Sequence, residues 1–311
     1  MLIEEIADGL RQMPKRLSSK FFYDEEGSRL FQQIMGLPEY YPTRTEFGIL
    51  EKYGPELAAE WAAGGPLLLL ELGAGDGLKT KLLLRALQAA QADFTYAPVD
   101  ISASAVQGLA RSLRQELPAL RVTPVVAEYE AALGQVGAAG GRRAVLFLGS
   151  NIGNFHPAQR RQFLAALAAP LAAGDALLIG FDLQKDPRQI RAAYDDSQGV
   201  TAAFNLNLLR RLNRELGADF QLENWQHYAD YDPLSGAARS YLVSTCAQQV
   251  RLAAQPQETF TFAAWEVIHT ENSYKFTRPQ IEALAADAGL RVRHFLTDEQ
   301  AWFADVVLTP V

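Results

Sequence analysis

The feature that most constrains this chain is an apolar strand that runs directly into a glycine-rich turn and then into a helix. Residues 66–77 read PLLLLELGAGDG, and residues 79–91 follow as KTKLLLRALQAAQ. Glycines after a buried strand let the backbone turn tightly and approach a ligand closely, at the sheet edge where open α/β folds bind ligands. The turn therefore predicts a ligand-binding α/β fold.

Apolar strands and amphipathic helices alternate through the rest of this region. Strands are expected at 94–100, 120–126, 142–150 and 175–183, and helices at 104–117 and 157–171. Such alternation is typical of a parallel sheet that is covered by helices on both faces. After a helix at 278–288, strands at 290–296 and 302–308 are joined by a turn too short for a parallel crossover. Parallel strands closed by an antiparallel C-terminal pair resemble the Rossmann-like sheet plan of class I methyltransferases, although at this point only the pattern is similar.

One long segment breaks the alternation and indicates a second domain. Residues 186–275 contain helix-like runs at 189–194 and 202–216, followed by strand-like runs at 240–247 and 259–270. The segment 1–60 is also helical in character, apart from an aromatic-rich stretch expected as a loop. We predict a second α+β substrate-binding domain made of 1–60 plus 186–275. The methyltransferase domain would then comprise 61–185 plus 276–311.

Composition and charge exclude several classes of partner. The formal net charge is −7 and no basic stripe is present, so nucleic acid is not an expected partner. The longest apolar run is far too short to span a membrane, and the first residues do not resemble a secretory signal. A single cysteine, Cys246, excludes an internal disulfide, and the four scattered histidines do not predict a metal site. We expect a cytoplasmic protein, with a monomer as the working assumption.

The glycine turn and the end of the next strand predict a nucleoside-type cofactor. Gly73 and Gly75 lie in the turn, and Asp100 ends the following strand, where its carboxylate can accept hydrogen bonds from ribose hydroxyls. A dinucleotide-binding dehydrogenase is the alternative. It is disfavoured because the turn reads GxGxG rather than GxGxxG and because the sheet closes antiparallel.

Further candidates follow along the same sheet edge. Lys79 can bind a cofactor carboxylate from the start of its helix, or it can be a solvated lysine. Glu128 and Tyr129 follow the third strand, where such folds bind adenine, and Gly149 ends the fourth strand. Asn154 offers both a donor and an acceptor to an amino-acid head group, although it can equally cap the next helix.

Six segments in order strongly resemble the histidine-specific Nα-methyltransferases of ergothioneine biosynthesis. They are KFFYDEEGSRLFQQI (20–34), LPEYYPTRTE (37–46), ELGAGDGLKT (71–80), FLGSNIGNF (147–155), AYDDSQGVTAAFN (193–205) and TENSYKF (270–276). The resemblance implies a class I methyltransferase that uses S-adenosylmethionine, releases S-adenosylhomocysteine and converts free histidine to its trimethylated form, hercynine. It also implies cofactor binding by Gly73, Lys79, Asp100, Glu128 and Tyr129, and we add Gly75 and Gly149 as cofactor-binding candidates from the same sheet edge.

The resemblance assigns the substrate residues as well. Tyr40, Asn154 and Tyr194 would hold the amino-acid head group, Glu271 and Ser273 the imidazole, and Tyr23 would lie near the amine. Catalysis would involve Tyr23 and Asn154. The chemistry agrees, since Glu271 and Ser273 are two apart and would share one face of a strand. Ser240, however, stands where the family often has methionine. A methyltransferase for another aromatic amine such as tryptophan, or a non-catalytic cofactor-binding module, therefore stays open.

Overall fold

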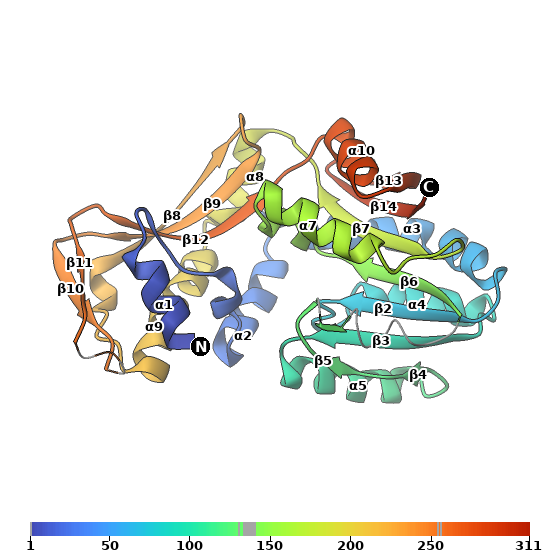
Figure 1. The fold of residues 1–311 in the computed structure, drawn as a ribbon, viewed down its shortest axis with the longest axis horizontal. Helices are drawn as coiled ribbons and strands as arrows, with labels where there is room; N and C mark the ends of the chain where they lie inside the picture. Colours follow the sequence, from blue (N-terminus) through green and yellow to red (C-terminus); the bar gives the residue numbers. More distant parts are fainter. Residues whose placement is uncertain (1, 130, 133–140, 254, 256) are drawn as a thin grey trace. The chain divides into compact units, whose positions relative to one another are not determined.

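The chain divides into two compact units. The computed structural model describes residues 2–129, 131–132, 141–253, 255 and 257–311. Unit 1 comprises Met1–Tyr41 and Lys185–Tyr274, and unit 2 comprises Pro42–Gln184 and Lys275–Val311 (Figure 1). The second segment of unit 1 covers residues 185–274, one residue from the expected 186–275 at each end. The first segment, however, ends at residue 41 rather than at residue 60. The reason is helix α3 (Tyr41–Ala62), whose Leu50, Leu57 and Trp61 pack into the core of unit 2.

Unit 2 is built on one mostly parallel sheet in the order β13-β14-β7-β6-β2-β3-β4, with β5 also pairing with β3. Its strands are β2 (Leu67–Leu72), β3 (Phe94–Asp100), β4 (Arg121–Val122), β5 (Val125–Val126), β6 (Arg142–Phe147), β7 (Ala176–Asp182), β13 (Leu290–Thr297) and β14 (Phe303–Pro310). Strands β2 to β7 pair in parallel, whereas β14 pairs antiparallel with both β7 and β13. The expected class I plan is confirmed, with the last strand of the chain inserted inside the edge.

Helices cover both faces of this sheet. They are α4 (Thr80–Ala89), α5 (Ala103–Glu116), α7 (Pro157–Ala168) and α10 (Arg278–Asp287), together with α3. Apolar side chains of α3, α4 and α5 share a core with β2, and α7 lies on the face opposite α3 (Figure 1). The central strands are therefore buried on both faces, which explains their continuous apolar runs. Among the described residues, no helix is both long and apolar enough to cross a membrane.

The expected strand at 120–126 is split into two short strands. β4 pairs with Thr95 and Tyr96, and β5 pairs with Val99 and Asp100. Between them Thr123 N donates to the Tyr96 carbonyl at 2.8 Å. Pro124 follows, and because proline has no amide hydrogen the ladder is interrupted there.

Unit 1 combines helices with a sheet in the order β1-β12-β9-β8 and a separate hairpin, β10-β11. The strands are β1 (Lys15–Arg16), β8 (Trp225–Asp232), β9 (Ala237–Ser244), β10 (Gln248–Arg251), β11 (Thr259–Phe262) and β12 (Val267–Tyr274), and the helices are α1 (Leu2–Arg11), α2 (Glu25–Met35), α8 (Pro187–Tyr194) and α9 (Val200–Leu216). Helices and sheet share one apolar core. The aromatic stretch that was expected as a loop contains α2, because Asp24 caps that helix by accepting from Gly27 N at 2.7 Å.

Candidate active site

The glycine turn after β2 adopts a backbone that only glycine accommodates easily. Gly73 and Gly75 have φ of 71° and 53°. Gly73 N donates to the Val99 carbonyl at 2.8 Å, which ties the turn to the end of β3. A β-carbon at Gly73 would lie 2.9 Å from the hydroxyl oxygen of Tyr129. The turn therefore brings the ends of β2 and β3 and the segment after β5 together at one edge of the sheet.

Asp100 is held in place by backbone amides at this edge. Its Oδ2 accepts from Gly75 N at 3.3 Å, and its Oδ1 accepts from Ser102 N at 2.9 Å. Each carboxylate oxygen keeps further acceptor capacity after one such bond. The structure thus joins Asp100 to the glycine turn, as the sequence predicts, and presents an oriented acceptor for hydroxyl groups.

Lys79 and Gly149 meet beside the same turn. A β-carbon on Gly149, whose φ is 78°, would lie 3.4 Å from the Lys79 ammonium nitrogen and 3.5 Å from Asn151 Nδ2. Asn151 donates from Nδ2 to the Leu148 carbonyl at 2.9 Å. The side chain of Asn151 therefore lies close to both Gly73 and Gly149, although sequence reasoning did not single it out.

Glu128 and Tyr129 differ in their surroundings. The side chain of Glu128 is exposed, whereas Tyr129 is half-buried and packs edge-on against Phe147 with ring centroids 5.3 Å apart. Burial, and then the charge of Asp100, raise the pKa of Tyr129 well above its ordinary value. Tyr129 is therefore a neutral hydroxyl group at this edge.

The buried carboxyl group of Glu71 connects the elements on either side of the glycine turn. Glu71 accepts from Thr80 Oγ1 at 2.5 Å and also from the Tyr96 hydroxyl. Burial raises the pKa of Glu71 to about 7, even though both hydrogen bonds favour the charged form. Glu71 thereby links β2 to the start of α4 and to β3.

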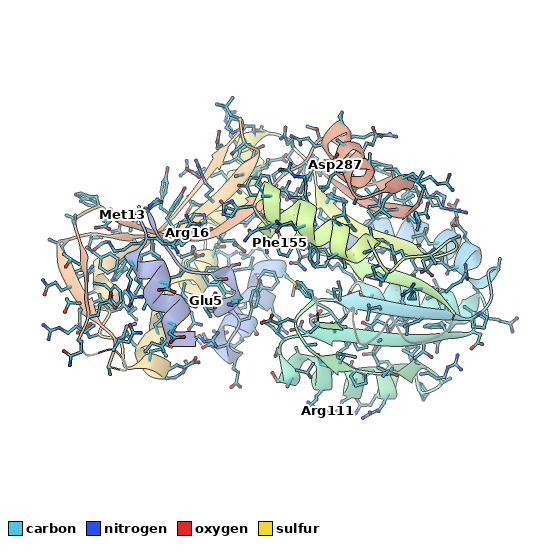
Figure 2. The ribbon with its side chains drawn as sticks, viewed as in Figure 1. Glu5, Met13, Arg16, Arg111, Phe155 and Asp287 are labelled. Atoms are coloured by element: carbon cyan, nitrogen blue, oxygen red, sulfur yellow. The ribbon has the colours of Figure 1, made fainter. Side chains whose placement is uncertain are left out.

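Asn154 does not cap the helix that follows it. It is the last residue of the 3₁₀ turn η2 (Asn151–Asn154), and the N-cap of α7 is His156. Phe155, labelled in Figure 2, follows Asn154 and stacks on Phe163 with centroids 4.7 Å apart. The capping interpretation of Asn154 is therefore wrong, and its half-buried amide is not committed to α7.

In unit 1, the predicted substrate tyrosines belong to one aromatic cluster. Tyr40 meets Tyr194 with ring centroids 6.5 Å apart, and Phe31 meets Tyr40 at 6.1 Å. Tyr23 lies 5.7 Å from Phe31 and 5.8 Å from Phe204. The structure thus brings Tyr40 and Tyr194 together, with Tyr23 joined to them through Phe31. Electron-rich ring faces of this kind can attract a cationic ammonium group.

A β-bulge turns Glu271 and Ser273 toward the core side of the unit 1 sheet. The register of β12 on β9 shifts between His269 and Glu271, so that Ile268, Glu271 and Ser273 lie opposite Leu242, Ser240 and Ala238. Directly opposed residues share a face, and Leu242 belongs to the core. Glu271 and Ser273 therefore share that face. Tyr194 lies there as well, and its hydroxyl donates to Ser273 Oγ at 2.7 Å.

Two residues that the sequence did not indicate support this cluster. His227 Nε2 lies 2.9 Å from the Tyr194 carbonyl, and since a carbonyl only accepts, the imidazole donates from Nε2. Burial lowers the pKa of His227, so the ring is neutral. Glu39 accepts from Ser197 Oγ at 2.7 Å, which ties the segment of Tyr40 to the segment after Tyr194. The only sequence signal was that Glu39 and Ser197 lie within two of the matched segments.

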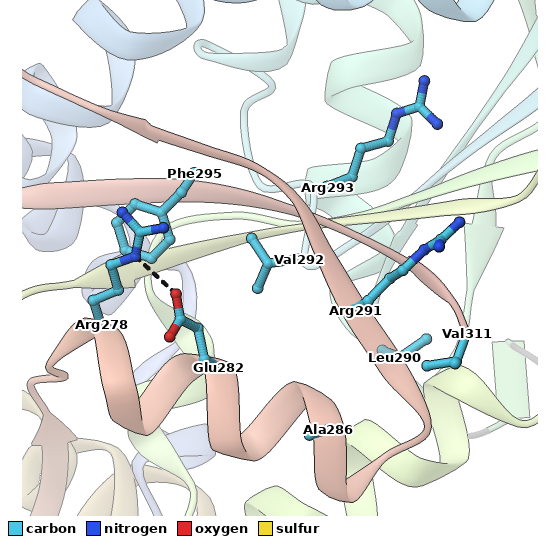
Figure 3. A pocket seen from close by; sticks show the side chains of 9 residues that line it. All are labelled: Arg278, Glu282, Ala286, Leu290, Arg291, Val292, Arg293, Phe295 and Val311. Carbon is cyan, nitrogen blue, oxygen red and sulfur yellow. Dashed lines mark hydrogen bonds and ion pairs between the residues drawn. The ribbon is translucent and has the colours of Figure 1, made fainter.

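Unit 2 also contains a surface groove. Its lining comes from α10, β13 and the C-terminal residue: Arg278, Glu282, Ala286, Leu290, Arg291, Val292, Arg293, Phe295 and Val311 (Figure 3). Arg278 Nε donates to Glu282 Oε1 at 2.8 Å, and its guanidinium lies 4.8 Å from the centre of the Phe295 ring. The candidate residues are all absent from this lining, so the groove is not the candidate active site.

Comparison with known families decides between the classes that this geometry allows. The family described as "Histidine-specific methyltransferase, SAM-dependent" matches residues 2–310. The chain belongs to this family. The match spans both units, so the resemblance predicted from short segments extends through nearly all of the sequence.

Similar proteins within and near this family methylate amino acids. Histidine N-alpha-methyltransferase of Mycolicibacterium smegmatis is 43% identical over 297 residues, covering 96% of this chain and 91% of that protein. The protein of the same name from Mycobacterium tuberculosis is 41% identical over 302 residues, covering 97% and 92%. L-tryptophan methyltransferase trpM of Psilocybe serbica is 30% identical over 332 residues, covering 96% and 90%.

The methyl donor of this histidine-specific family, S-adenosylmethionine, fits the edge of the unit 2 sheet. Gly73 leaves open the space that a β-carbon would fill beside Tyr129, the Asp100 carboxylate keeps acceptor capacity of the kind that suits ribose hydroxyls, and the Lys79 ammonium is a cation of the kind that pairs with a carboxylate. The chemistry of these groups matches a zwitterionic nucleoside.

We predict that Asp100→Asn raises the Kd for S-adenosylhomocysteine about tenfold, because one charge-assisted hydrogen bond is weakened while the shape is kept. Titration calorimetry measures this change. The matched control is Asp93→Asn, which alters an exposed aspartate just before β3 that pairs with Arg121. Equal affinities of the two variants would remove Asp100 from the cofactor site.

Proposed function

We propose that this protein transfers methyl groups from S-adenosylmethionine to the α-amine of L-histidine, the first step of ergothioneine biosynthesis, and that three transfers give hercynine. The family match over residues 2–310 carries this proposal. The identity of 43% to a histidine N-alpha-methyltransferase supports the choice of substrate. The aromatic and polar cluster of unit 1 supplies groups suited to an aromatic amino acid.

The proposal assigns the methyl donor to unit 2 and the ring of the substrate to unit 1. Bound S-adenosylmethionine supplies a methyl group that a sulfonium sulfur makes electrophilic. The residues proposed to hold it are Gly73, Gly75, Lys79, Asp100, Glu128, Tyr129 and Gly149. The protein itself then has to orient the acceptor and keep its amine neutral, and alignment alone accounts for about 7–11 kcal/mol of barrier lowering at best.

Recognition of imidazole needs one acceptor and one donor. We assign the acceptor to Glu271, whose carboxylate would accept a hydrogen bond from the proton-bearing ring nitrogen. We assign the donor to Ser273: the Tyr194 hydroxyl donates to Ser273 Oγ, so this bond uses an acceptor position of Ser273, and we assign the Ser273 hydroxyl proton to the other ring nitrogen. His227 Nε2 donates to the carbonyl of Tyr194 and so helps to fix the position of Tyr194. We assign Tyr40, Asn154 and Tyr194 to the amino-acid head group.

The amine must lose one proton before each of the three transfers. The Tyr23 side chain is 38% exposed and packs against Phe31 and Phe204, so it combines contact with the aromatic cluster and contact with water. We therefore assign Tyr23 to relay the proton to water, without a dedicated base. Asn154 would orient the head group during transfer. We keep the expectation of a monomeric cytoplasmic enzyme that acts on a free amino acid.

The test is to incubate purified protein with S-adenosylmethionine and each amino acid in turn, and to measure product masses. We expect mass increases of one, two and three methyl groups on histidine. Methylation of tryptophan without histidine would instead favour the activity named in the Psilocybe relative. Binding of S-adenosylhomocysteine with no product on any amino acid would favour a non-catalytic module.

A further inference from the structure

Glu46 of α3 is a buried carboxylate that the proposed mechanism has not used. Its side chain is completely buried. Gly149 N donates to Oε1 at 2.7 Å and to Oε2 at 3.0 Å, and the Lys79 ammonium forms an ion pair with Oε2. A charge buried in this way is costly unless it is paired and hydrogen-bonded. Both partners that stabilise Glu46 belong to the candidate cofactor site.

The sheet provides room for this carboxylate at Gly180 of β7. A β-carbon at Gly180 would lie 2.2 Å from Glu46 Oε1, so any larger residue would displace the carboxylate. Asp305 of β14 lies directly opposite Gly180 in the register and is also completely buried. Glu46 is thus held among the start of α4, the turn after β6 and the two strands β7 and β14.

Asp305 completes the charge balance of this cluster. Within the described part of the chain, neither of its carboxyl oxygens has a hydrogen-bond donor. Burial first, and then the charge of Glu46, raise the pKa of Asp305 well above its ordinary range. A protonated carboxyl group is a donor, and Glu46 is an acceptor beside it. One ammonium, one carboxylate and one neutral acid together carry no net charge, as a buried site requires.

We propose that Glu46 is a positioning residue of the methyl-donor site, which fixes the ammonium of Lys79 and the amide of Gly149 in a single arrangement. This inference rests on the proposed function, because it takes Lys79 as a cofactor residue. A lysine that is held in advance loses less rotamer freedom when it binds an anion. Its ammonium has three donors, so two remain for the cofactor carboxylate. Because the amide of Gly149 donates to Glu46, Gly149 would contribute to the cofactor site by allowing the cofactor to approach the backbone closely, and not by donating a hydrogen bond to it.

The first test compares Glu46→Gln with Glu116→Gln in the full chain. Glu116 of α5 pairs with Lys81, two residues beyond Lys79 on the same helix, and its side chain is 36% exposed. Calorimetry with S-adenosylhomocysteine should show a Kd increased about tenfold or more for Glu46→Gln and changed less than about twofold for Glu116→Gln. Equal Kd values would overturn the proposal. If the unaltered protein does not bind S-adenosylhomocysteine, the proposed function itself fails.

A spectroscopic test separates positioning from a merely structural role. The infrared spectrum of the unaltered protein minus that of Asp305→Asn should contain a protonated carboxyl band from Asp305, because the contribution of Glu71 is common to both proteins and cancels. The band should also disappear in Glu46→Gln, because Asp305 then ionises to balance Lys79. Asp305→Asn keeps a neutral donor beside Glu46. The Kd of Asp305→Asn for S-adenosylhomocysteine should therefore be at least about threefold lower than the Kd of Glu46→Gln.

Two further variants keep the proposal testable if Glu46→Gln does not fold. Gly180→Ala leaves every charge in place but displaces the Glu46 carboxylate, so it should weaken S-adenosylhomocysteine binding as Glu46→Gln does. Asp305→Asn supplies the infrared assignment independently. Unchanged affinity in a folded Gly180→Ala variant, or a protonated carboxyl signal that Asp305→Asn leaves unchanged, would each overturn the inference.

Discussion

Replacing Asp182 with alanine is expected to lower the free energy of unfolding of unit 2 by about 3–5 kcal/mol. Asp182 ends β7, and its Oδ2 lies 2.7 Å from the ammonium nitrogen of Lys275, with both side chains at most 1% exposed. Removing the carboxylate leaves the ammonium buried without this counter-charge. The lysine cannot recover solvation unless the surrounding core opens, so the loss appears as instability.

The measurement requires a signal from unit 2 alone. Of the four tryptophans, Trp61 and Trp302 belong to unit 2, whereas Trp225 and Trp265 belong to unit 1. Urea denaturation followed by fluorescence in a Trp225→Phe, Trp265→Phe background therefore reports unit 2. The matched control is Glu282→Ala, which breaks an exposed pair with Arg278 on α10. That change should cost about 0.3–0.5 kcal/mol. A loss no larger than the control would show that Asp182 does not stabilise Lys275.

Most strands of the parallel sheet could be predicted from the sequence because long apolar runs indicate burial on both faces. The runs 94–100 and 175–183 are mostly apolar, and they form β3 and β7 with nearly the expected ends. Local pattern was less informative where polar residues alternate irregularly. The segment WQHYADYD forms β8 in the structure, yet it gave no strand prediction. Its pairing with β9 over eight residues is a tertiary contact that single-sequence periodicity does not contain.

Candidate residues at strand ends were predictable for a similar reason. Parallel strands end at a common edge, so Gly73 and Asp100 had to lie close together. Glu46 could not be found this way, because α3 reaches the site through packing rather than through sheet order. Glu46 fits only because Gly180 has no β-carbon, and this depends on how α3 packs on β7, which the sequence does not give. Likewise, the spacing of Glu271 and Ser273 predicted a shared face, but only the bulge after His269 determines which face.

The assignment of imidazole recognition leads to an expected loss of histidine affinity in Glu271→Ala. The Kd for histidine, measured by calorimetry with S-adenosylhomocysteine present, should rise about 10- to 150-fold, since a hydrogen bond to a charged group contributes about 1.5–3 kcal/mol. Removal of the carboxylate leaves the proton-bearing ring nitrogen without its acceptor. Glu258→Ala is the control, because Glu258 is an acid of unit 1 that pairs with Arg11 outside the aromatic cluster. Histidine affinity equal to that of the control would contradict the assignment.

The same calorimetric experiment, repeated with tryptophan, distinguishes histidine from tryptophan as the substrate. Imidazole carries one donor and one acceptor nitrogen, and in our assignment Glu271 accepts from the first while Ser273 donates to the second. Indole has a single ring nitrogen, which only donates, so Ser273 would have no partner on it. A site that rejects an analogue lacking one polar atom does so because its own buried group is left unpaired. We therefore expect the unaltered protein to bind histidine far more tightly than tryptophan, and Glu271→Ala to narrow that difference by lowering histidine affinity alone.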